Sequence, residues 1–227
     1  MDQTELKRQA AAAAVAEVQD GMVLGLGTGS TAALAVELLG ARVRDGLRIV
    51  GIPTSERTAA QATGLGIPLA TFAEHASIDL TIDGADEVHT GTLDLIKGLG
   101  GALLREKIVA AASRRMTVIV DESKLVPALG RGVRLPVEVV AFGIEATLRH
   151  LRDAGADPLL RPGPDALYRT AGGNLIADCA FDGIADPAGL HARLKAITGV
   201  VETGLFIGMA TRVIAGTPAG PRILELP

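Results

Sequence analysis

Short apolar runs alternate with segments of helical spacing through the first half of the chain. The runs have the length and composition of buried strands, and the segments between them repeat apolar residues at the helical period. This alternation predicts a doubly wound, mostly parallel α/β sheet. The expected strands are 22–26, 47–52, 67–70, 78–83 and 116–120, and the expected helices are 2–19, 32–39, 55–64 and 102–116.

The pattern changes after a linker at 127–132. Strands, helices and strands follow in the order βαββαβ, which is typical of a ferredoxin-like α+β domain. Two further strands around the GTPAG turn, 211–214 and 223–226, return the chain to the first domain. We therefore expect an α/β domain from 1–130 plus 207–227 and a small domain at 131–206. The small domain's strands are expected at 136–140, 158–161, 174–181 and 199–206, and its helices at 144–154 and 187–197.

Composition narrows the classes of partner and compartment. The 227 residues are 48% hydrophobic with a net charge of −4, which gives no electrostatic footprint for nucleic acid or an anionic membrane. One cysteine, Cys179, excludes an internal disulfide framework, and the four histidines lack metal-ligand spacing. The N-terminus mixes acids and bases, unlike a secretory signal, and no apolar run approaches the ~18 residues of a membrane span. We expect a cytoplasmic protein without a metal.

The first strand is followed by Gly27-Thr28-Gly29-Ser30-Thr31 and a helix, the arrangement of an anion cradle. A Walker loop would need GK[ST], which is absent. A dinucleotide site would need a carboxylate at the end of the second strand, where the chain has Pro53-Thr54-Ser55 instead. The pattern therefore favours a small phosphorylated molecule over NAD.

The stretch 82–107 concentrates groups that could carry chemistry. Asp83, Asp86 and Glu87 follow a buried strand, Lys97 opens a glycine-rich turn, and Glu106 is expected in the second turn of the next helix. Each acid alone is better explained as a turn cap or a solvated helix residue. The set, with Lys97 among them, favours a catalytic site. Lys124 follows the strand 116–120 to the same sheet edge, and Lys7 lies on the first helix; for each, a solvated surface lysine is the alternative.

The chain carries six distinctive motifs in order: GLGTGST at 25–31, DGADE at 83–87, KGLGGALLREK at 97–107, DESK at 121–124, LPVEV at 135–139 and GVVETGLF at 199–206. By these motifs together, the chain resembles the ribose-5-phosphate isomerase A family over nearly its whole length. The resemblance implies interconversion of D-ribose 5-phosphate and D-ribulose 5-phosphate through an enediolate.

The resemblance also implies roles for individual residues. Glu106 would accept the proton, Asp83 would shuttle protons at the oxygens, Asp86 would assist ring opening and Lys97 would stabilise oxyanion charge. No cofactor is implied, and we expect a homo-oligomer, a dimer or a tetramer. The phosphate would be held by Thr28, Gly29, Ser30, Thr31, Lys7 and Lys124, and the sugar by Gly84, Ala85, Gly98, Leu99 and Gly100.

Other functions remain as alternatives. An aminosugar-phosphate isomerase/deaminase or a coenzyme A transferase would share the phosphate cradle, but a deaminase would be expected to supply a histidine for ring opening. A non-catalytic sugar-phosphate sensor would be expected to lose the base, whereas Glu106 is present.

Overall fold

The computed structural model describes residues 2–164 and 166–226 and divides the chain into two compact units. The first unit comprises Met1–Ala85, Arg105–Leu125 and Gly208–Pro227, and the second comprises Asp86–Leu104 and Val126–Ile207. The second unit therefore includes a segment that the sequence led us to expect in the first. Within the segment 86–104, the short strands 87–89 and 95–96 pair with each other. The strand 95–96 also pairs with the later strand 205–206 of the second unit, which explains why the segment belongs there.

The first unit is built on a six-stranded sheet with the order β14-β13-β6-β3-β1-β2. All neighbouring strands are parallel except β13 and β14, which form an antiparallel hairpin. The mostly parallel α/β fold expected from the sequence is thus confirmed. The strands are β1 (Val23–Leu26), β2 (Val50–Pro53), β3 (Leu80–Asp83), β6 (Met116–Asp121), β13 (Arg212–Thr217) and β14 (Gly220–Leu224).

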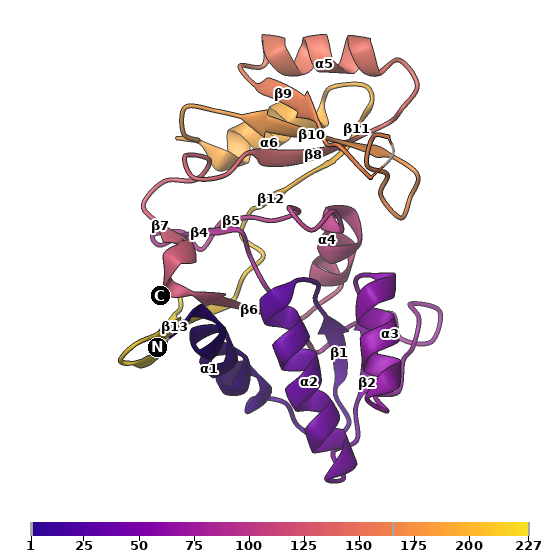
Figure 1. The fold of residues 1–227 in the computed structure, drawn as a ribbon, viewed down its shortest axis with the longest axis vertical. Helices are drawn as coiled ribbons and strands as arrows, with labels where there is room; N and C mark the ends of the chain where they lie inside the picture. The colour runs from indigo at the N-terminus through magenta and orange to yellow at the C-terminus, as the bar shows by residue number, and fades with distance from the viewer. Residues whose placement is uncertain (1, 165, 227) are drawn as a thin grey trace. The chain divides into compact units, whose positions relative to one another are not determined.

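Helices cover both faces of this sheet. Helices α1 (Gln3–Val15), α2 (Ser30–Arg44) and α3 (Glu56–Gly64) lie side by side in Figure 1 and share one core cluster with the apolar strand residues of that face. On α4 (Leu103–Ala111), Val109 packs with Ile52 and Ile78 in a separate cluster. The doubly wound arrangement follows from apolar residues on both faces of the parallel strands.

Several elements differ from the expected ones. Helix α4 starts at Leu103, so Glu106 lies in its first turn and not its second. The same helix ends at Ala111 because the N–H of Arg114 bonds to the carbonyl of Ile78 and leads the chain into β6. The expected strand at 67–70 contributes only one bridge, between Leu69 and Gly51.

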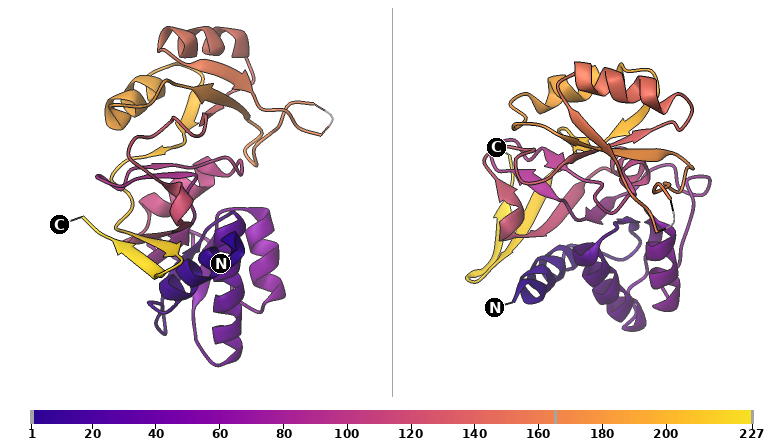
Figure 2. Two further views of the ribbon diagram at one scale, coloured as in Figure 1. Left: turned by 60° about the vertical axis from the view of Figure 1, so that its left-hand side comes forward. Right: turned by 45° about the horizontal axis from the view of Figure 1, so that its top comes forward.

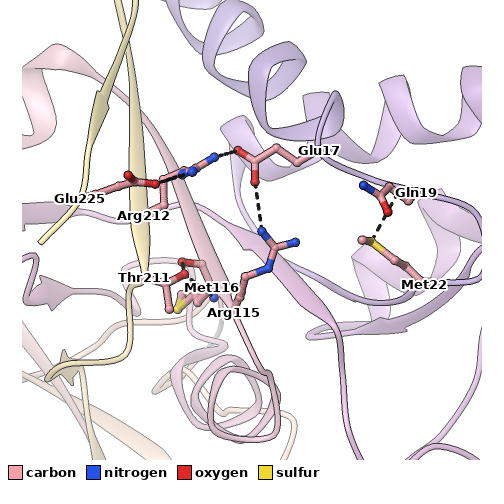
Figure 3. A network of polar contacts seen from close by, with 8 residues as sticks. All are labelled: Glu17, Gln19, Met22, Arg115, Met116, Thr211, Arg212 and Glu225. Atoms are coloured by element: carbon pink, nitrogen blue, oxygen red, sulfur yellow. Dashed lines mark hydrogen bonds and ion pairs between the residues drawn. The ribbon is translucent and has the colours of Figure 1, made fainter. Parts of the chain in front are cut away.

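Helix α1 also ends earlier than expected, at Val15, and the residues after it make a polar network. Glu17 accepts a hydrogen bond of 2.6 Å from Arg212 and pairs with Arg115 at 3.8 Å (Figure 3). Arg212 also binds Glu225, and the two acidic partners raise the pKa of the Arg212 guanidinium. The network joins the end of α1 to β13, the segment after β14 and the segment before β6.

The other half of α1 packs directly on β13. A Cβ at Gly216 would lie 1.8 Å from the carbonyl oxygen of Leu6, so only glycine allows this approach. Gln3 donates a hydrogen bond of 3.3 Å to Asp121 at the end of β6. These contacts fix the helix turn that carries Lys7 at the carboxyl end of the sheet.

The second unit contains an antiparallel sheet with the order β11-β8-β10-β9, the ferredoxin-like arrangement expected from the sequence. Helices α5 (Ile144–Asp153) and α6 (Pro187–Lys195) pack into one core cluster with this sheet; Figure 2 shows the unit from two directions. The strands are β8 (Leu135–Val139), β9 (Asp157–Leu160), β10 (Leu175–Ala180) and β11 (Val200–Thr203).

Cys179 lies inside this cluster. The thiol is fully buried, and desolvation is the main cause that raises its pKa from the ordinary 9.0 to about 12. Because the thiolate is the reactive form, this side chain is a core residue and not a nucleophile.

A small second sheet completes the unit, with the order β12-β5-β4-β7. Its strands are β4 (Glu87–His89), β5 (Leu95–Ile96), β7 (Leu125–Val126) and β12 (Leu205–Phe206).

None of the helices in the described ranges is long and apolar enough to cross a membrane.

Candidate functional site

Three motif-bearing loops of the first unit leave neighbouring parallel strands at the same edge. Gly27–Thr31 follows β1, Asp83 ends β3, and Asp121 ends β6, with Glu122–Lys124 directly after it. Strand β3 pairs in parallel with both β1 and β6, so their carboxyl ends lie together. From β1 the chain adds β2 on one side of the sheet and β3 on the other, so the strand order reverses between β1 and β3. Ligands bind at such a switch point in open α/β sheets.

Asp83 links two of these loops through one carboxylate oxygen. Its Oδ1 accepts hydrogen bonds from the N–H of Thr28 at 3.0 Å and of Gly84 at 2.7 Å, and the residue is fully buried. A Cβ at Gly27 would lie 2.2 Å from the same oxygen. Glycine at 27 is therefore required for the carboxylate to reach the β1 loop, and the two amides fix the direction of the second oxygen, Oδ2.

The hydroxyl of Thr28 faces neighbouring hydroxyls. Its Oγ1 lies 2.7 Å from that of Thr54, 2.8 Å from Ser55 Oγ and 3.1 Å from Thr58 Oγ1. The Thr28 hydroxyl donates to Ser55 Oγ, so it is directed at the segment after β2. Sequence reasoning missed Thr54, Ser55 and Thr58 as supports of the loop, although the hydroxyl-rich segment after β2 was a visible signal.

The start of α2 has the features of an anion site. Gly29 is its N-cap, with φ of 122°, and this residue has no side chain to accept a hydrogen bond from the first N–H groups of the helix. Lys7 Nζ donates to Ser30 Oγ at 3.1 Å, which brings a cation to the same helix end. Backbone N–H groups and the helix dipole both favour an anion at such an end.

Lys124 lies on a short 3-10 helix, η1 (Glu122–Lys124), directly after β6. Asp121 caps this turn by accepting from the N–H of Ser123 at 3.2 Å, and it also accepts from Gln3 of α1. The turn that carries Lys124 is thereby tied to the helix that carries Lys7.

Glu106 is not the solvated helix residue of the simpler interpretation. It is 4% exposed, and its neighbour Arg105 pairs with Glu56 of α3 at 2.8 Å. Burial of a carboxylate costs free energy unless hydrogen bonds or opposite charges offset it, so glutamate is an unusual residue at a buried helix position.

The second unit carries Asp86, Lys97 and the glycine loop. Asp86 Oδ2 accepts a hydrogen bond of 3.0 Å from the N–H of Leu99. Lys97 is 2% exposed, and its Nζ lies 5.5 Å from the centre of the Phe206 ring, within the range of a cation–π contact.

Glu87 has a different task from the other acids of the DGADE motif. It is 3% exposed and accepts hydrogen bonds from the N–H groups of Gly130 at 2.7 Å and Gly132 at 2.9 Å. Both glycines belong to the linker segment 127–132. The carboxylate thus organises the linker.

Among the described residues, no group of three or more His, Cys, Asp or Glu side chains is arranged to hold a metal ion.

The chain is similar to known proteins over its full length. The family model described as Ribose 5-phosphate isomerase A (phosphoriboisomerase A) matches residues 50–220. The Ribose-5-phosphate isomerase A of Gloeobacter violaceus is 59% identical, over 99% of this chain and 97% of the relative. The chain belongs to the ribose 5-phosphate isomerase A family. The resemblance inferred from the six motifs is confirmed.

Solved structures of the ribose 5-phosphate isomerase A family have the same fold. The enzyme of Methanocaldococcus jannaschii is 42% identical and superposes with a TM-score of 0.94, over 98% of this chain and 99% of that one. A D-ribose-5-phosphate isomerase in complex with phospho-erythronic acid is 40% identical with a TM-score of 0.97, and each chain is covered completely.

The close approach at Gly27 gives a stability test. Gly27→Ala should lower the free energy of unfolding by about 1–3 kcal/mol, because the added methyl would overlap the buried Asp83 carboxylate. Gly64→Ala is the control: this exposed glycine on α3 has nothing within 4 Å of a Cβ, and alanine should raise helix stability by about 0.5–1 kcal/mol. Urea unfolding followed by circular dichroism measures both. Equal stability of Gly27→Ala and the wild type would contradict the described approach.

Proposed function

We propose that this chain interconverts D-ribose 5-phosphate and D-ribulose 5-phosphate through an enediolate, as an aldose-ketose isomerase of the non-oxidative pentose phosphate pathway. The observation that carries the proposal is the 59% identity with a relative named Ribose-5-phosphate isomerase A over 99% of this chain. Each unit carries candidate residues of the kinds that this reaction requires.

The phosphate end of the substrate is assigned to the start of α2. The amides of Gly29, Ser30 and Thr31 offer donors, and Lys7 and Lys124 add positive charge. The overall charge of −4 supports this local arrangement, because an acidic protein needs a built positive site to hold a doubly charged phosphate. Thr28 contributes through its position in the loop, since its hydroxyl is engaged by Thr54, Ser55 and Thr58.

Proton transfer is assigned to Glu106. Isomerisation removes the proton from C2 of the aldose and returns a proton to C1, and a single carboxylate can serve both carbons because they are adjacent. Its burial supports the role, since a side chain packed on all sides keeps one position relative to the two carbons from the first transfer to the second.

The oxygens of the sugar are assigned to three further groups. Lys97 stabilises the negative charge that develops on the enediolate, and its burial strengthens that interaction. Asp83, held by two amides through Oδ1, shuttles protons between the oxygens. Asp86 assists opening of the furanose ring. The sugar lies against Gly84, Ala85, Gly98, Leu99 and Gly100.

The complex of the related enzyme with phospho-erythronic acid supports this chemistry. A sugar acid of that kind carries a planar carboxylate where an enediolate carries its two oxygens, and a phosphate at the other end. We infer that the same compound binds here as a competitive inhibitor, since it presents both features that the site is assigned to recognise.

Cytoplasmic location and a homo-oligomeric state remain predictions. The single buried thiol supports a reducing compartment. Light scattering coupled to size exclusion determines whether the assembly is a dimer or a tetramer.

Removal of the proposed base should disable turnover and spare binding. Glu106→Gln keeps the shape of the side chain and should lower kcat by about 10²- to 10⁴-fold, the usual contribution of a positioned general base. A coupled assay for ribulose 5-phosphate measures this. Glu56→Gln is the control, because its side chain is 83% exposed and lies beside Arg105 on the same unit. Near-normal turnover by Glu106→Gln would show that another group moves the proton.

The proposed phosphate anchor should act on KM. Lys7→Ala should raise KM by at least about 10-fold with a smaller change in kcat, because Lys7 holds a group that does not react. Arg8→Ala removes the same charge from the next position of α1, where Arg8 pairs with Glu37 at 3.5 Å, and should leave KM within about two-fold. Equal shifts in the two variants would assign the effect to general electrostatics.

A further inference from the structure

Arg161, directly after β9 in the second unit, contacts the glycine loop 98–101. Its Nη1 donates hydrogen bonds to the carbonyl oxygens of Gly98 at 3.0 Å and Leu99 at 2.9 Å. No motif of the sequence singled this arginine out. It lies 63 positions from Gly98 and 62 from Leu99, so only the fold brings these residues together.

The guanidinium itself is held in place from several sides. Its Nε donates to Asp178 Oδ2 at 2.9 Å, and its Nη2 donates to the other oxygen of the same carboxylate. The two side chains are 12% and 17% exposed. The Tyr168 ring also lies against the guanidinium, 5.8 Å from Cζ to the ring centre. A two-pronged arginine–carboxylate pair fixes direction as well as position.

The loop needs such support because its backbone is irregular. Gly98 and Gly101 have φ of 105° and 81°, a region that only glycine adopts readily. A Cβ at Gly101 would lie 2.1 Å from Tyr168 Oη, so the loop rests directly on the tyrosine. Loop conformations of this kind persist where the surroundings determine them.

The two hydrogen bonds also set the direction of two amides. Peptide groups are planar and trans, so the N–H of Leu99 and of Gly100 point away from the carbonyls that Arg161 binds. The first of these N–H groups meets Asp86 Oδ2 at 3.0 Å. Arg161 and Asp86 therefore hold the peptide between Gly98 and Leu99 from opposite sides, and the Gly100 amide is oriented with it.

We propose that Arg161 is a positioning residue of the isomerase: by binding the carbonyls of Gly98 and Leu99, it orients the Gly100 amide and the Asp86 carboxylate toward the sugar oxygens. The inference rests on the proposed function, which assigns the loop and Asp86 to the sugar. A purely structural role would tie β9 to the loop and affect stability, without a selective effect on turnover.

The test compares variants of the pair with a matched arginine. Arg161→Ala should lower kcat by about 10- to 100-fold, the scale expected when reacting groups are misplaced by about 1 Å. Arg161→Lys should share most of this loss, because lysine cannot bind the carboxylate and both carbonyls at once. Arg134→Ala is the control: among the described residues, Arg134 hydrogen-bonds to the backbone carbonyls of Asp157 and Asp178 on the same sheet and pairs with the Asp157 carboxylate, and none of these bonds reaches the loop.

Three readouts separate positioning from stability. Thermal unfolding measures the fold of each variant, steady-state kinetics separates kcat from KM, and added guanidinium ion at millimolar concentration should restore part of the kcat of Arg161→Ala. Asp178→Asn provides a second variant if Arg161→Ala does not fold, and should lower kcat by about 10-fold, because it leaves the arginine present but less firmly oriented.

The outcomes distinguish this inference from the proposed function. An inactive wild type would overturn the proposed isomerase activity. An active wild type together with a folded Arg161→Ala whose kcat is within two-fold would overturn only the positioning role. Equal kcat losses in Arg161→Ala and Arg134→Ala would overturn it as well. The selective, guanidinium-rescued loss is the result that we expect.

Discussion

The geometry of the candidate site in the first unit depends on one contact at the carboxyl edge of its sheet, where Asp83 accepts hydrogen bonds from the N–H groups of Thr28 and Gly84. The contact ties the end of β3 to the loop after β1, and it requires glycine at 27. It thereby couples the two halves of the proposed chemistry in this unit. The loop assigned to the phosphate and the acid assigned to the sugar oxygens cannot shift independently of each other.

The second unit holds its part of the chemistry in a similar way, through side chains that bind backbone groups. Asp86 and Arg161 bind the glycine loop from two sides, while Glu87 binds the linker glycines 130 and 132. Such charge-assisted bonds to main-chain groups are stronger than neutral ones. They allow glycine-rich segments, which are entropically costly to order, to adopt one conformation.

The sequence predicted the strands of the six-stranded sheet and of the sheet β11-β8-β10-β9, both fold types and the family, because hydrophobic period and motif spacing are local signals. It did not predict the short strands β4, β5 and β7, the task of Glu87, the hydroxyl cluster around Thr28 or the role of Arg161. These features depend on which distant segments meet, as with Arg161 and Gly98, and a solvated arginine has the same appearance in a sequence. The end of α4 was also missed, since the Arg114 amide bonds to the carbonyl of Ile78, two residues before β3.

The central claim is that one carboxylate moves a proton between C2 and C1 of a phosphorylated pentose whose phosphate is held elsewhere. Isomerisation of ribose 5-phosphate in D2O, followed by NMR, tests it directly. The account predicts that deuterium from the solvent appears at C1 of ribulose 5-phosphate at a rate that depends on the enzyme, because the proton on a carboxylate exchanges before its return. Isomerisation with complete retention of the original hydrogen, as in a hydride shift, would contradict it.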